Sequence, residues 1–68
     1  MISMWTIFDH PPEYPAYFVA RYFIMDQPTA SLMLSETLDP LRDALAGAGF
    51  VMLARMPDDD PKIVEVWI

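Results

Sequence analysis

The chain has no cysteine and only two glycines among its 68 residues. Without cysteine it can form neither a disulfide nor a thiolate metal site, so its stability must come from apolar burial. Two glycines cannot build a glycine-rich phosphate loop. Basic residues are also scarce, because four Lys and Arg stand against ten Asp and Glu and give a net charge of −6. This balance argues against direct binding to nucleic acid or to an anionic membrane surface, since both require clustered cations.

Long apolar segments are absent as well. The longest run, residues 16–25, is interrupted by Arg21, whereas a membrane-spanning helix needs roughly 18 or more apolar residues. Residues 1–5 lack the basic residues with which a signal peptide begins. The sequence therefore predicts a cytoplasmic protein with no membrane segment and no export.

Apolar residues, in contrast, are plentiful. They make up 54% of the chain, and aromatic residues make up 13%. A chain this short forms one domain, residues 1–68, whose high ratio of surface to volume leaves part of this apolar content exposed. Pairing of two copies would cover the surplus without a new fold, so we expect a homodimer.

Prolines separate the apolar runs and divide the chain into short elements. The alternation and the β-branched and aromatic content predict strands at about residues 4–9, 17–25, 30–34, 50–55 and 63–68. Between the third and fourth strands, a stripe of leucines predicts a helix at about residues 38–47, with Thr37 as its N-cap and Gly47 and Gly49 at its end. The order β-β-β-α-β-β with short connections predicts an α+β fold, in which one helix packs on one face of an antiparallel sheet of about five strands.

One helix can cover only one face of such a sheet. In the last strand, alternation places Ile63, Glu65 and Trp67 on one face and the valines on the other. Tryptophan is a frequent interface anchor. We therefore expect Trp67, together with Ile63 and Tyr22, to form an apolar or dimer contact on the uncovered face.

Residue types used in catalysis occur without a catalytic pattern. His10 stands near Asp9 and Glu13 in a proline-rich loop, but this spacing corresponds to no known motif. The run Asp58-Asp59-Asp60 lacks the spacing of a calcium loop. The sequence predicts a protein that is not an enzyme and holds no cofactor or metal, with a small enzyme using His10 as a less favoured alternative.

The same acidic run fits protein recognition better than metal binding. Asp58, Asp59 and Asp60 are predicted to lie in the turn before the last strand, and Glu65 follows in that strand. Carboxylates at the tip of a turn can meet Arg and Lys of a partner. These residues are predicted to bind a protein partner with a basic surface.

Three stretches carry a family resemblance: WTIFDHP at residues 5–11, YFVAR at residues 17–21 and DDPKIVEVWI at residues 59–68. They resemble a family of small uncharacterised proteins from alphaproteobacteria and their phages. Members of that family open with Met-Trp-Thr, as at residues 4–6, which makes residues 1–3 an extension; the loop at residues 26–29 departs from the pattern. The resemblance implies a small accessory protein of a mobile element and transfers no functional residues.

Charge and resemblance together favour one function over another. The favoured hypothesis is a non-enzymatic, acidic protein-binding module, such as an anti-CRISPR-like inhibitor that occupies the basic nucleic-acid-binding surface of a host effector. The alternative is a structural or housekeeping homodimer of a small accessory protein with no inhibitory target.

Overall fold

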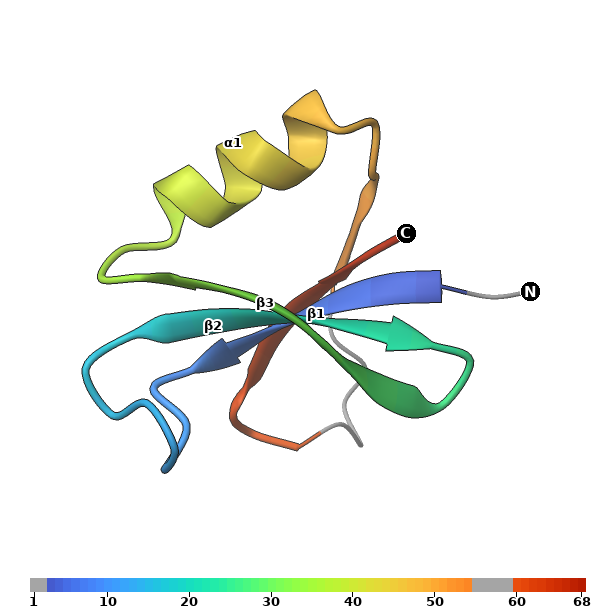
Figure 1. Cartoon of the computed structure of the whole chain (residues 1–68). Coiled ribbons are helices and arrows are strands. Elements are labelled where there is room, and N and C mark those ends of the chain that lie inside the picture. The colour runs from blue at the N-terminus through green and yellow to red at the C-terminus, as the bar shows by residue number, and fades with distance from the viewer. Residues whose placement is uncertain (1–2, 55–59) are drawn as a thin grey trace.

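The computed structural model describes residues 3–54 and 60–68. In chain order its elements are β1 (Ser3–Asp9), β2 (Phe18–Ile24), β3 (Gln27–Ser35), α1 (Asp39–Gly47), β4 (Met52–Ala54) and β5 (Ile63–Trp67). The described residues thus form an antiparallel five-stranded sheet with one helix, which confirms the predicted fold class and element order (Figure 1).

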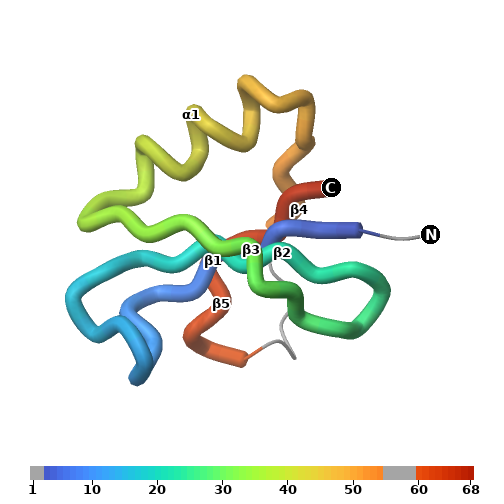
Figure 2. Tube along the Cα trace, in the orientation of Figure 1, coloured from blue at the N-terminus to red at the C-terminus, as the bar shows by residue number. Residues whose placement is uncertain are grey.

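The strands lie in the order β3-β2-β1-β5-β4, and every neighbouring pair is antiparallel. The first strand, β1, is therefore the centre of the sheet. Helix α1 connects the two outer strands, β3 and β4, and crosses one face of the sheet on the way (Figure 1). Figure 2 shows β4 descending from the far end of α1 and lying beside the C-terminus.

The core lies between α1 and the sheet. Leu41 and Leu45 of the helix pack on Ile7 of β1 and Ala20 of β2, both of which are fully buried. The predicted leucine stripe therefore forms the contact with the sheet. Around this centre, the following residues complete the apolar layer: Trp5, Phe18, Met33, Leu38, Phe50, Val64 and Trp67.

The helix begins differently from the prediction. Leu38 is the N-cap and already has helical dihedral angles, its carbonyl accepts a hydrogen bond from Arg42 N–H at 3.0 Å, and no side chain caps the helix. The N-cap prediction for Thr37 is wrong, because Thr37 lies one residue before the N-cap; its backbone N–H donates a hydrogen bond to Ser35 Oγ at 3.3 Å. At the other end Gly49 has a φ of 94°, the left-handed conformation that glycine favours, whereas Gly47 is still helical.

The β2–β3 hairpin is also tighter than expected. Its turn is Met25-Asp26, so the predicted turn at residues 26–29 is wrong and β3 begins at Gln27. Met25 has a φ of 56°, as two-residue hairpin turns require at their first position. Pro28 fits inside β3 because this is an outer strand, where the missing N–H need not interrupt the sheet. Thr29 Oγ1 donates to the carbonyl of Tyr22 at 2.8 Å across the register shift in this hairpin.

Truncation of Leu45 tests whether the layer under α1 holds the fold together. We expect Leu45→Ala to lower the free energy of unfolding by about 2–5 kcal/mol, a large share of the roughly 3–10 kcal/mol typical of a domain this size. Denaturant titration followed by circular dichroism measures this change. Leu34→Ala is the matched control, since Leu34 is exposed on β3 and its loss is expected to cost no more than about 0.5 kcal/mol. Equal losses in the two variants would contradict the assignment.

Candidate functional site

Glu65 lies inside the protein instead of at its acidic surface. Only 3% of the residue is exposed. Its Oε1 accepts a hydrogen bond from Arg42 Nε at 2.8 Å and lies 2.7 Å from Arg42 Nη2, and its Oε2 accepts one from the Trp67 indole N–H at 2.9 Å. The prediction that Glu65 contacts a partner is therefore wrong, because both of its oxygens are used within the fold.

This contact joins the helix to the sheet. Arg42 lies on α1 and Glu65 on β5, so the ion pair spans the two layers. By accepting the Arg42 hydrogen bond and attracting its positive charge, the Glu65 carboxylate raises the pKa of Arg42 above its ordinary value. Arg42 is therefore positively charged throughout the neutral range, and Glu65 satisfies the buried indole N–H of Trp67 as well.

The predicted dimer contact is not a common surface. Trp67 is 7% exposed and belongs to the core under α1. Tyr22 packs on Trp5 on the same, helix-covered side, with ring centroids 5.0 Å apart. Ile63 pairs with Phe8, whose side chain lines the opposite face. The prediction that Trp67, Ile63 and Tyr22 share the uncovered face is therefore wrong, because α1 covers the side of the sheet on which Trp67 and Tyr22 lie.

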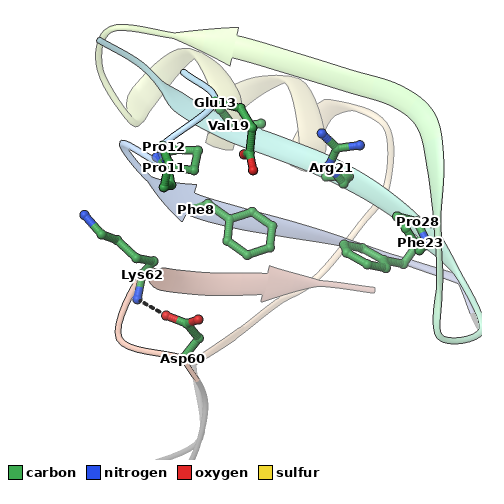
Figure 3. Close-up of a pocket in the computed structure, with 10 residues that line it drawn as sticks. All are labelled: Phe8, Pro11, Pro12, Glu13, Val19, Arg21, Phe23, Pro28, Asp60 and Lys62. Carbon is green, nitrogen blue, oxygen red and sulfur yellow. Dashed lines mark hydrogen bonds between the residues drawn. The ribbon is translucent and has the colours of Figure 1, made fainter. Parts of the chain in front are cut away.

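A cavity of about 380 Å³ occupies the face without the helix (Figure 3). Its apolar walls come from Phe8 of β1 and from Val19 and Phe23 of β2. Prolines close its sides, and charged residues complete its lining. The remaining lining residues are Pro11, Pro12, Glu13, Arg21, Pro28, Asp60 and Lys62. Such a hollow with mainly apolar walls and a few polar groups is the usual form of a binding site.

The proline-rich loop between β1 and β2 shapes one side of this cavity. Pro11 is buried, and its carbonyl accepts a hydrogen bond from Tyr14 N–H at 2.9 Å. A second turn follows, in which Tyr17 N–H donates to the carbonyl of Tyr14 at 3.1 Å. Fixed proline dihedrals and these turns hold the loop in one conformation, which forms a wall of the cavity.

The segment before β5 borders the cavity on another side. Asp60 Oδ1 accepts a hydrogen bond from Lys62 N–H at 2.9 Å, and the Asp60 carbonyl accepts one from Ile63 N–H at 2.9 Å. Lys62 is tied to the sheet in turn, since its carbonyl accepts the N–H of Asp9 at 2.7 Å. Asp60 is exposed in this ordered turn, whereas Asp58 and Asp59 lie outside the described residues.

Exposed carboxylates gather at the end of the sheet where the proline-rich loop and the Asp60 turn border the cavity. The antiparallel order brings the ends of β1 and β3 together with the starts of β2 and β5 (Figure 1). The exposed acidic residues in or next to these segments are Asp9, Glu13, Glu36, Asp39 and Asp60. We call this set the acidic end. Asp26, in the β2–β3 turn, lies at the opposite end of the sheet.

Cations line the cavity too. Arg21 lies on β2, and its Nη1 donates to the carbonyl of Thr29 at 3.4 Å, a long hydrogen bond that leaves most of its donors unused by the described residues. Figure 3 shows Arg21 and Lys62 at separate places on the cavity lining, with Phe8 between them. The cavity thus offers an apolar floor with charges of both signs at its edge.

His10 has structural contacts beside the acidic end. Its Nδ1 is paired with Asp9 Oδ1, and its ring meets Phe18 edge to face with centroids 4.7 Å apart. The residue has a φ of 47°, which places it in the tight turn that leaves β1. These contacts hold the loop against β2, and a reaction of His10 stays the less favoured prediction. Among the residues that the structure describes, no group of three or more His, Asp or Glu side chains could hold a metal ion.

The chain matches no protein-family model, and comparisons with curated proteins and with solved structures also give no match. The family resemblance of the three sequence stretches therefore stays a prediction. Within residues 3–54 and 60–68, no helix is long and apolar enough to cross a membrane.

Neither the cavity nor the Arg42–Glu65 pair was predicted from the sequence. The pair had a signal: Glu65 is the single charge in an otherwise apolar strand, and Arg42 follows the first turn of the helix next to Leu41. A charge in such a strand is typical of a buried residue with a partner. No sequence pattern indicated the cavity, because the cavity depends on how the proline-rich loop folds over β1 and β2.

Replacement of Glu65 tests the buried network. Glu65→Leu keeps a similar side-chain volume but leaves the indole N–H of Trp67 without an acceptor, which costs about 1–3 kcal/mol. For a domain of this size each kcal/mol lowers the melting temperature by roughly 4–8 °C, so calorimetry resolves the change. Asp43→Asn, which replaces an exposed carboxylate on α1, is the control and is expected to melt like the wild type. A Glu65→Leu protein of undiminished stability would show that the network contributes nothing net.

Proposed function

We propose that this protein is a non-enzymatic protein-binding module that docks its acidic end on a basic surface of a partner. The observation that supports this most is the position of Glu13 and Asp60, which are exposed carboxylates at the edge of an apolar cavity. In this arrangement the cavity receives an apolar side chain of the partner, and the carboxylates around it meet neighbouring Arg or Lys.

The two parts of the site have different tasks. Burying one Leu or Phe side chain against Phe8, Val19 and Phe23 supplies about 1.5–3 kcal/mol. The cavity volume of about 380 Å³ is large enough for such a side chain. The carboxylates add attraction that acts over a longer range, speeds the encounter and selects against acidic partners. A basic surface with one protruding apolar residue therefore matches the site best.

Proteins that grip nucleic acid present such basic surfaces. We therefore infer that the partner is a nucleic-acid-binding protein and that this chain competes with its nucleic acid. The narrower hypothesis, an anti-CRISPR-like inhibitor, is supported by the net charge of −6 and by the family resemblance of the three sequence stretches.

Charge reversal at the acidic end tests the electrostatic part. The probe is a fluorescein-labelled peptide of arginines with one central leucine, whose binding is followed by fluorescence anisotropy at low and at raised salt. Glu13→Lys is expected to weaken binding roughly tenfold, or about 1.4 kcal/mol, and to reduce the dependence on salt. Asp43→Lys makes the same change of charge on α1, which packs on the opposite face of the sheet from the cavity, so that the sheet and salt screen its effect. Equal weakening by both variants would mean that net charge alone attracts the peptide.

The cavity is tested with a second peptide in which alanine replaces the central leucine. The wild-type protein is expected to prefer the leucine peptide by roughly fivefold, about 1 kcal/mol, because only leucine fills the cavity. Phe23→Ala is expected to abolish this preference while leaving the attraction to arginine unchanged. Met25→Ala removes an exposed apolar side chain outside the cavity and serves as the control. A preference that survives Phe23→Ala would place the apolar contact elsewhere.

A further inference from the structure

The outer strand β4 exposes apolar side chains on both of its faces. Val51 is 62% exposed, Met52 49% and Leu53 46%, and Ile68 beside them is 50% exposed. Natural sheets protect such an edge with charges, prolines or a covering segment. Residues 51–54 carry no charge and no proline, whereas the other outer strand, β3, contains Pro28 and polar residues. This difference marks β4 as the edge that is built to pair.

The backbone of β4 shows which of its groups point away from the sheet. Val51 and Ile68 form a hydrogen-bonded pair, with Val51 N–H to Ile68 O at 2.6 Å and Ile68 N–H to Val51 O at 2.9 Å. In an antiparallel ladder such pairs alternate with non-bonded ones, so Leu53 also directs its N–H and C=O toward β5. Met52 and Ala54 then direct theirs outward, away from the sheet.

We propose that β4 of a second copy of this chain pairs with this edge. The two strands run antiparallel about a two-fold axis that passes between the two copies of Leu53. Met52 of each copy then exchanges backbone hydrogen bonds with Ala54 of the other, and each Leu53 faces its counterpart in a non-bonded pair. The result is one sheet that continues through both copies.

Self-pairing in this register fits the strand in two ways. It uses every outward N–H and C=O of Met52 and Ala54. It also places the exposed Leu53 side chains against each other on one face, where cross-strand apolar pairs add stability.

Charge favours the antiparallel sense as well. The end of β4 points toward the acidic end of its own copy, because β4 and β1 run in the same direction on either side of β5. Antiparallel pairing therefore sends the two acidic ends to opposite ends of the continuous sheet. Two copies that each carry a net charge of −6 thus associate with their densest carboxylates apart, which reduces repulsion.

This dimer is independent of the proposed function. The cavity lies over β1 and β2, and none of its lining residues belongs to β4. A monomer that still binds the arginine peptides would overturn only the dimer, and a dimer that ignores them would overturn only the binding site.

Cysteine cross-linking tests the register, since the chain has no cysteine of its own. Non-bonded antiparallel pairs have Cα atoms about 4.5 Å apart, within the range of about 4.4–6.8 Å that a disulfide needs. Leu53→Cys is therefore expected to form a covalent dimer under mild oxidation. In the Met52→Cys variant the two cysteines lie about 8 Å apart on the diagonal, so it is expected to cross-link far less. Equal or stronger cross-linking at Met52 would overturn the register.

Sedimentation of the Leu53→Lys variant tests the interface without relying on oxidation. The wild type is expected to sediment as a concentration-dependent dimer, and Leu53→Lys to raise the dissociation constant by at least about tenfold because it places like charges across the axis. Leu34→Lys adds the same charge at an exposed leucine of β3 and is expected to leave the dimer intact. Circular dichroism confirms that both variants are folded. The proposal would be overturned by a wild-type protein that stays monomeric at all concentrations, even if its β4 pairs with another protein. A Leu53→Lys protein that dimerises normally would overturn it as well.

Discussion

The buried carboxylate of Glu65 determines how the two layers of this protein fit together. It accepts hydrogen bonds from Arg42 on α1 and from Trp67 on its own strand. A carboxylate under a helix is unfavourable unless both oxygens have partners, so the helix is held where Arg42 can reach. That position turns the Trp67 side of β5 into the core and leaves the opposite side of the sheet without a helix.

The face without the helix is organised by rigid chain segments. Pro11 and Pro12 stand against Phe8, and the turn at Asp60 closes another side. Prolines hold this shape at little cost in conformational entropy, since they are already restricted in the unfolded chain. A small domain thereby keeps a cavity that α1 does not cover. The acidic end follows from the same arrangement, because the loops that frame the cavity carry exposed carboxylates.

Much of the fold could be predicted because the sequence marks its elements locally. Prolines and turns separate the strands, and the leucine stripe identifies the helix and its buried side. The first residue of β3 could not be predicted from such local patterns. Pro28 is tolerated in this strand only because the topology makes β3 an outer strand. A proline that looks like part of a turn in the sequence is part of a strand in the sheet.

The face that the helix covers could not be predicted from alternation alone. Glu65 made its side of β5 appear polar, and only contact with Arg42, 23 residues earlier, makes that side the interior. A register shift is a second reason why alternation fails in β5. Ile7 pairs with Glu65, but the next residue, Phe8, pairs with Ile63. Val64 is the extra residue of this bulge and packs toward the core, while Ile63 moves to the cavity side. The candidate site depends on these long-range contacts, which explains why the sequence indicated acidity but not the cavity beside it.

The site and the free edge lie on different parts of the sheet, and their positions fit one assembly. In the proposed pair the sheet continues through β4, and the cavity of each copy stays open because it lies over β1 and β2. The two acidic ends point in opposite directions, so one dimer presents two separate sites. A partner with one basic surface is then bound once by each copy, whereas a partner that repeats its basic surface gains from both sites through effective concentration. In the proposed dimer the geometry of the edge therefore determines how the two sites are placed relative to each other, even though no residue of β4 lines the cavity.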